Sequence, residues 1–243
     1  MGNQSADALL TSDSVQPARP QRRSLPAMAR SPFARLQLFR NPFGELTRSE
    51  RAELAIAEVS DCLNWLQRCQ RAVLQILGPC GHGKTTHLLA IERGLPYSGY
   101  VYFPEDGSQP RLPAARPLLV DEGQRLGWRR RRQLLGGSGP LVIGTHVDLS
   151  DPFERAGFQV QTLDLSIPMR PAQLRNILNS RIAASIVQSD TLDAMKLESL
   201  YLQLEQVVVL QQQFGSNIRR IEHYLYEVFQ RFAEKGEPWL PAS

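Results

Sequence analysis

The chain has 243 residues, of which 42% are hydrophobic and 21% charged, and its formal net charge is +4. This length and composition predict a globular α/β domain with a small helical appendage. No uninterrupted apolar run approaches the roughly 20 residues that span a bilayer, which argues against a membrane-spanning helix. Three cysteines, an odd and sparse number, argue against a disulfide framework and favour a reducing location, which we expect to be cytoplasmic.

Residues 1–40 are rich in Ser, Pro, Arg and Gln and contain few large apolar side chains. Six arginines stand against two aspartates in this segment, so its net charge equals that of the whole chain. Such a segment cannot bury enough apolar surface to offset the entropy lost on ordering. We therefore expect a disordered basic tail over residues 1–40.

The first folded elements follow the turn Asn41–Gly44. Thr47 followed by Glu50 has the spacing of a capping box, which predicts a helix start at this point. Apolar residues between Ala52 and Leu66 then recur at helical spacing, which predicts one helix running to about Arg71.

Short apolar runs alternate with helical patterns in the middle of the chain. Five strands are expected, at residues 72–77, 100–103, 118–120, 141–144 and 158–165. Helices are expected at 84–93 and 123–135, and then at 171–186, 190–213 and 217–234. Alternating strands and helices followed by helices alone predict an α/β fold: a parallel five-stranded sheet flanked by helices, with a small C-terminal all-helical lid. The expected boundaries are 41–168 for the core, 169–235 for the lid and 236–243 for a flexible end.

A glycine-rich segment between the first strand and its following helix matches the phosphate-loop pattern GxxxxGK(S/T) from Gly78 to Thr85. Glycines let backbone N–H groups converge on phosphate oxygens, and a helix N-terminus favours the same anion. Lys84 is expected to reach the β- and γ-phosphates, and Thr85 to give its hydroxyl to Mg²⁺. The predicted nucleotide-binding residues are Gly78, Pro79, Cys80, Gly81, His82, Gly83, Lys84, Thr85 and Thr86. The predicted ligand is ATP with Mg²⁺, because the stretch nearest to a guanine-specificity motif, 145–148, has His where that motif has Lys.

Two carboxylates end the third expected strand, 37 residues after Lys84. Ligands bind at the carboxyl edge of open α/β sheets, so Asp121 is expected to hold Mg²⁺ and Glu122 to activate the attacking water. The fourth strand ends in Thr145 and His146, where a polar group could contact the γ-phosphate. Thr145 is the first choice for this role and His146 the alternative; an ordinary strand-end cap is the other interpretation.

These motifs resemble those of the AAA+ ATPases, over roughly residues 41–232. GPCGHGKTT (78–86), LLVDE (118–122) and GSNIRRIEHYL (215–225) carry the resemblance; the last is similar to the sensor-2 element of replication initiators, and DEGQRL (121–126) to transposition helpers and secretion-type ATPases. The resemblance implies that Arg219 contacts the γ-phosphate from the lid. It also implies that Arg155 acts on the nucleotide of a neighbouring subunit and that residues 41–43 cover the adenine. An assembly of several copies in the ATP-bound state is therefore expected.

Two features depart from that family. The connection between the second and third strands is short and rich in proline, where the family usually has a helix, which argues against a threading unfoldase. No asparagine ends the second strand to restrain Glu122.

Four consecutive arginines, Arg129–Arg132, follow Trp128 just after the acidic pair. Three interpretations fit these arginines. They could form a solvated helix face, or contact nucleic-acid phosphates while Trp128 stacks on a base, or form an interface with a neighbouring subunit. The sequence leaves these three interpretations open.

The sequence therefore predicts an enzyme that hydrolyses ATP with Mg²⁺ to drive assembly or a conformational switch on a partner, either double-stranded DNA or a protein client. The alternative is a scaffold or signalling switch that binds the nucleotide, hydrolyses it slowly and has no nucleic-acid role. A small-molecule kinase fits the acidic pair and the late Arg219 segment poorly.

Overall fold

The computed structural model describes residues 31–187 and 194–236. Its centre is a five-stranded sheet in the order β2-β3-β4-β1-β5, in which every neighbouring pair is parallel. The strands are β1 (Ala72–Leu77), β2 (Gly99–Tyr102), β3 (Leu118–Asp121), β4 (Leu141–Thr145) and β5 (Gln159–Asp164). This order places the carboxyl ends of β3, β4 and β1 side by side, at the edge where ligands bind. The sheet predicted from the sequence is confirmed.

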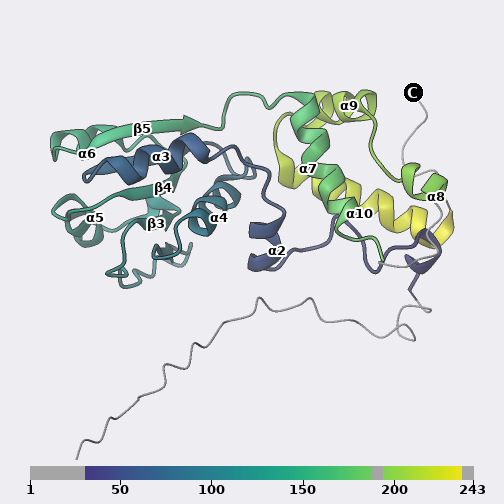
Figure 1. The fold of residues 1–243 in the computed structure, drawn as a ribbon, viewed down its shortest axis with the longest axis horizontal. Coiled ribbons are helices and arrows are strands. Elements are labelled where there is room, and N and C mark those ends of the chain that lie inside the picture. Colours follow the sequence, from purple (N-terminus) through teal and green to yellow (C-terminus); the bar gives the residue numbers. More distant parts are fainter. Residues whose placement is uncertain (1–30, 188–193, 237–243) are drawn as a thin grey trace, which may run out of the picture.

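Helices cover both faces of the sheet (Figure 1). On one face α3 (Ser60–Arg68) and α4 (Lys84–Gly94) bury Leu66 and Leu88 against Leu74 and Ile76 of β1. On the other face α5 (Trp128–Leu135) and α6 (Ser150–Arg155) pack on side chains that include Val73. Successive residues of a strand point to opposite faces, which explains why one apolar run serves both cores.

A separate helical bundle follows β5 (Figure 1). Its helices are α7 (Pro171–Ala183), α8 (Ala194–Glu198), α9 (Leu204–Phe214) and α10 (Ile218–Lys235). Leu178, Val207, Leu225 and Phe229 form its fully buried centre. The bundle therefore has a hydrophobic core of its own, distinct from the two cores of the sheet.

The segment before the sheet domain belongs to the helical bundle. Phe33, Leu36 and Leu38 are buried in the bundle core, around the short 3-10 helix η1 (Ala34–Leu36). Leu38 also forms an antiparallel bridge with Ile186. The expectation of a disordered tail through residue 40 is thus wrong for residues 31–40, because three large apolar side chains find a core far away in the sequence. Residues 1–30 and 237–243 lie outside the described part of the chain.

The long helix expected after Thr47 is two helices. The capping box of Thr47 and Glu50 is confirmed, with both reciprocal hydrogen bonds present, and it starts α2 (Arg48–Glu53). The chain then leaves the helical path until α3 begins at Ser60, because Leu54 and Ile56 face a cavity whereas Val59, Cys62 and Leu66 pack on the sheet. The apolar residues that looked like one helical stripe thus divide between the cavity and the sheet.

Two other expected helices are also divided. The stretch 123–135 contains the 3-10 helix η2 (Gly123–Arg125) and α5, and 190–213 contains α8 and α9, with residues 190–193 outside the described chain. Within the described residues, no helix combines the length and apolar character needed to cross a membrane.

Candidate nucleotide-binding site

The glycine-rich loop joins β1 to α4, as the sequence pattern predicts. Gly81 and Gly83 have φ angles of +84° and +90°, a backbone region that side chains disfavour. At Gly81 a Cβ atom would also lie 2.3 Å from Oδ1 of Asn217, so a side chain there would displace that amide. The loop therefore combines a tight left-handed path with close approach of the helical bundle.

Lys84 lies inside this loop and is 5% exposed. Its ammonium donates hydrogen bonds to the carbonyl oxygens of Gly78 (3.0 Å) and Pro79 (3.1 Å). Burial lowers the pKa of Lys84 from its ordinary value, and the nearby carboxylate of Glu122 opposes that effect. A buried ammonium held by neutral carbonyls is well placed to gain from an anion, such as a phosphate.

Thr85 and Asp121 meet at the foot of the loop. The Thr85 hydroxyl donates to Oδ2 of Asp121 at 2.8 Å, and the Tyr100 hydroxyl donates to the same oxygen at 2.8 Å. Burial raises the pKa of Tyr100, so its phenol remains a hydrogen-bond donor at neutral pH.

These oxygens fit Mg²⁺, which takes oxygen ligands and is bound through one or two carboxylates together with substrate phosphates. The described residues contain no group of three or more His, Cys, Asp and Glu side chains that could hold a metal alone. Thr85 and Asp121 are thus the candidate metal-binding residues.

Glu122 begins the turn after β3 in a left-handed conformation, with φ of 62°. Its Oε2 accepts a hydrogen bond of 2.5 Å from Gln124, and it lies 3.3 Å from Nε2 of His146 and 3.4 Å from Nη2 of Arg125. Gln124 in turn accepts from the backbone N–H of His146. Three side chains, those of Gln124, His146 and Arg125, therefore orient this carboxylate.

The two candidates at the end of β4 have different surroundings. Thr145 is fully buried, and its hydroxyl donates to the carbonyl of Val147 at 2.9 Å, as a strand-end cap does. His146 instead lies between Lys84, with 3.3 Å from Nδ1 to Nζ, and Glu122. The structure thus groups His146, the alternative choice, with the lysine and the acid.

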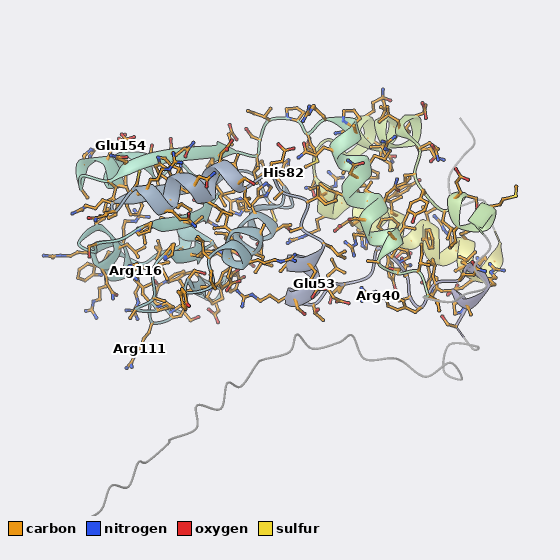
Figure 2. The ribbon with its side chains drawn as sticks, in the orientation of Figure 1. Arg40, Glu53, His82, Arg111, Arg116 and Glu154 are labelled. Atoms are coloured by element: carbon orange, nitrogen blue, oxygen red, sulfur yellow. The ribbon has the colours of Figure 1, made fainter. Side chains whose placement is uncertain are left out.

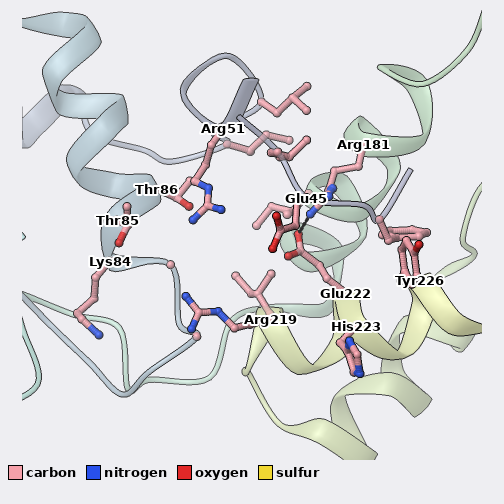
Figure 3. Close-up of a pocket in the computed structure, with 18 of the residues that line it drawn as sticks. Glu45, Arg51, Lys84, Thr85, Thr86, Arg181, Arg219, Glu222, His223 and Tyr226 are labelled. Atoms are coloured by element: carbon pink, nitrogen blue, oxygen red, sulfur yellow. Dashed lines mark hydrogen bonds and ion pairs between the residues drawn. The ribbon is translucent and has the colours of Figure 1, made fainter. Parts of the chain in front are cut away.

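A cavity of about 590 Å³ extends from the loop between the sheet domain and the helical bundle (Figure 3). Lys84, Thr85 and Glu122 lie at its loop end. Its other end is lined by apolar side chains and also by three carboxylates: Phe43, Leu46, Leu54, Ile56, Met169, Ile177, Tyr226, Glu45, Glu222 and Glu227. A positive end joined to an apolar end suits a molecule with phosphates at one end and a ring system at the other.

Two arginines that line the cavity are absent from every sequence motif. Arg181 is buried, and its guanidinium already has partners: it donates to the carbonyl oxygens of Pro42 and Gly44 and pairs with Glu222. It therefore holds the 42–44 segment over the cavity. The guanidinium of Arg51 of α2 has no hydrogen bond or ion pair to any described residue, and Arg51 lines the cavity together with Thr86 of the loop (Figure 3). No signal in the sequence distinguished these two arginines, because their role depends on contacts between distant segments.

The start of α10 lies against the loop. Asn217 caps the helix by accepting from the N–H of Arg220 and also donates to the carbonyl of Cys80 at 3.2 Å. Arg219 extends toward the loop, with 3.5 Å between its Nη1 and the sulfur of Cys80 (Figure 3). The helical bundle thus touches the phosphate loop through the segment that contains the predicted sensor arginine.

Arg155 is not part of this cavity. It ends α6, its side chain is 79% exposed, and it pairs with Asp151 of the same helix at 2.7 Å. Within one chain it contacts none of the predicted nucleotide-binding residues, so a role in the reaction requires a second subunit.

A parallel sheet whose first strand passes through a glycine-rich loop into a helix defines the P-loop class of α/β folds. No protein-family model and no curated protein matches the chain. Among solved structures it is similar to the RuvB Holliday junction branch migration motor of Thermotoga maritima, with 19% identity and a TM-score of 0.45 over 78% of this chain and 63% of that one. For the R170A variant of that RuvB the values are 20%, 0.47, 74% and 62%. The chain thus spans less than two thirds of the length of these RuvB chains, and the likeness concerns the fold alone.

Proposed function

We propose that this chain is an AAA+ type ATPase that binds ATP with Mg²⁺ and hydrolyses its γ-phosphate bond. One observation carries the proposal: Lys84, the Thr85–Asp121 pair and Glu122 converge at one end of a cavity that the helical bundle closes. The groups proposed for nucleotide binding and water activation thus lie together under the helical bundle.

The charge distribution of the cavity orients the nucleotide. Lys84, Arg51 and Arg219 gather at the loop end, where the N-terminus of α4 adds its partial positive charge. The ring system then lies at the apolar end, against Phe43 and Tyr226. The His at position 146, in place of the lysine of a guanine-specificity motif, favours ATP over GTP.

Hydrolysis requires a water molecule aligned with the γ-phosphate and a base to take its proton. Glu122 is that base, and Gln124 and His146 hold its carboxylate in position. Mg²⁺ held at Thr85 and Asp121 would supply neutralisation of the charge that develops on the phosphate oxygens. His146, within reach of both Lys84 and Glu122, takes the γ-phosphate contact that the sequence assigned first to Thr145.

The helical bundle acts as the lid that reports the nucleotide state. Asn217 and Arg219 already contact the loop, so a γ-phosphate there changes their partners and the lid position. The exposed Arg155 reaches a neighbouring subunit in an assembly formed with ATP. This cycle drives assembly or a switch on a DNA or protein partner.

Steady-state ATP hydrolysis with Mg²⁺, measured across a range of protein concentrations with and without double-stranded DNA, tests this function. We expect a specific rate that rises with protein concentration, because Arg155 acts only between subunits. Tight ATP binding with a low, concentration-independent rate would instead establish the scaffold or switch alternative. Absence of ATP binding would overturn both.

Arg51 provides a test of the nucleotide position. We expect Arg51→Ala to weaken ATP binding about 10- to 100-fold, because hydrogen bonds to charged groups contribute about 1.5–3 kcal/mol. Isothermal titration calorimetry measures the change. Arg93→Ala, which removes an exposed arginine at the far end of α4, is the matched control and should bind ATP like the wild type. Equal affinities for Arg51→Ala and the control would show that the phosphates lie elsewhere.

A further inference from the structure

A second surface, formed by α5 and the connection before β3, carries an exposed aromatic ring and arginines that the nucleotide site does not use. Trp128 begins α5 and is 68% exposed, which is unusual for so large an apolar side chain. The guanidinium of Arg129 lies 5.3 Å from the centre of its ring. Neither residue belongs to the nucleotide cavity.

The arginines of this surface lack acidic partners. None of Arg129–Arg132 forms an ion pair with a carboxylate in the described parts of the chain. Arg129 and Arg132 are both exposed and, three residues apart, lie on the same side of α5. Arg116, labelled with Arg111 in Figure 2, adds a guanidinium next to the end of α5, where it donates to the carbonyl of Ser138.

The nearby carboxylates do not neutralise these arginines. Glu105 pairs with Arg125 at 2.6 Å, so Asp106 is the one other carboxylate of residues 105–116, against Arg111, Arg116 and the four arginines of α5. The surface over α5 therefore keeps an excess of positive charge, which favours an anionic partner.

A groove lined by Gln109, Gly127, Trp128, Arg129 and Arg130 runs beside the exposed ring. Gln109 fixes its floor: Oε1 accepts from the N–H of Gly127 at 2.8 Å, and Nε2 donates to the carbonyl of Arg125 at 2.9 Å. Arg130 donates to the carbonyl of Gln109 at 3.2 Å. The aromatic ring and the arginines are thus held on a fixed support rather than on a loose loop.

We propose that this surface binds single-stranded nucleic acid. Arg129, Arg132 and Arg116 neutralise successive phosphates, and Trp128 stacks on an unpaired base that enters the groove. An exposed ring beside a positively charged groove is the combination that tracks single strands, because every base has a face for stacking and a duplex keeps those faces covered. The proposal goes beyond the nucleotide site and holds whether or not ATP is hydrolysed.

Fluorescence anisotropy of a labelled oligo(dT) with the full chain, titrated at several salt concentrations, tests it. We expect Arg129→Ala combined with Arg132→Ala to weaken binding and to reduce the salt slope by about 0.7 for each lost phosphate contact. Trp128→Ala should weaken binding about fivefold to a hundredfold while leaving the salt slope unchanged, because stacking contributes about 1–3 kcal/mol per base.

Arg68→Ala combined with Arg231→Ala is the matched control, since it removes two exposed arginines on α3 and α10 and the same total charge. The control should bind like the wild type. Equal losses in the two double variants would assign binding to overall charge and overturn the proposal. Absence of binding to any nucleic acid would also overturn it and leave the surface to a protein partner. If a duplex binds as tightly as the single strand and Trp128→Ala leaves the affinity unchanged, the single-strand assignment is overturned.

Discussion

Replacing Lys84 by alanine is expected to abolish ATP binding. Lys84 is buried among the carbonyls of its own loop, and a phosphate is the one partner that would compensate the desolvated ammonium fully. ATP at 100 times its Kd should stabilise the wild type by about 2.7 kcal/mol, which raises the Tm of a chain of this size by about 5–10 °C. The variant should show no such shift when thermal unfolding is followed with Mg²⁺ and ATP.

The same measurement without nucleotide separates binding from folding. Because burial disfavours the charged form of Lys84, Lys84→Ala should unfold at a temperature close to that of the wild type when ATP is absent. Arg93→Ala removes a positive charge from the exposed end of the same helix and should keep the full ATP-dependent shift. A retained shift in Lys84→Ala would mean that the glycine-rich loop does not hold the phosphates.

Glu122→Gln should separate binding from turnover. Glutamine keeps the size of the side chain but cannot accept a proton from water, so the hydrolysis rate should fall about 10²- to 10⁴-fold with little change in ATP affinity. Rates from phosphate release and affinity from calorimetry, measured on the same preparation, show both effects.

Glu105→Gln is the control for this change. Glu105 is an exposed carboxylate that also pairs with Arg125, but it does not line the nucleotide cavity. It should keep its turnover, whereas an equal loss in both variants would trace the effect to Arg125. Unchanged turnover in Glu122→Gln would remove Glu122 from the role of base.

Local patterns predicted the parts of the molecule that depend on local geometry. The phosphate loop follows from glycines and a lysine at fixed spacing, and the capping box at Thr47 from two residues three apart. The buried strands β1, β3 and β4 follow from short apolar runs, because a strand covered on both faces needs mainly apolar residues, whereas the edge strand β5 is largely exposed.

The remaining features depend on tertiary contacts that the sequence pattern does not encode. Thr145 and His146 are adjacent and both polar, and the turn after β4 decided which one faces Lys84. Arg181 became a structural residue because its helix crosses the 42–44 segment. Phe33 and Leu38 looked like isolated apolar residues in a polar tail, but their core is supplied by helices more than a hundred residues later.

The described chain passes between the sheet domain and the helical bundle twice, once before α2 and once between β5 and α7. Figure 1 shows these two connections apart from each other, the β5–α7 connection at the upper edge and the other below it. A movement that stretches neither connection is a rotation about the line that joins them. Such a rotation of the bundle would change the contacts of Asn217 and Arg219 with the phosphate loop. Under the proposed function, ATP binding would bias that rotation, and a neighbouring molecule resting on the bundle would move with it.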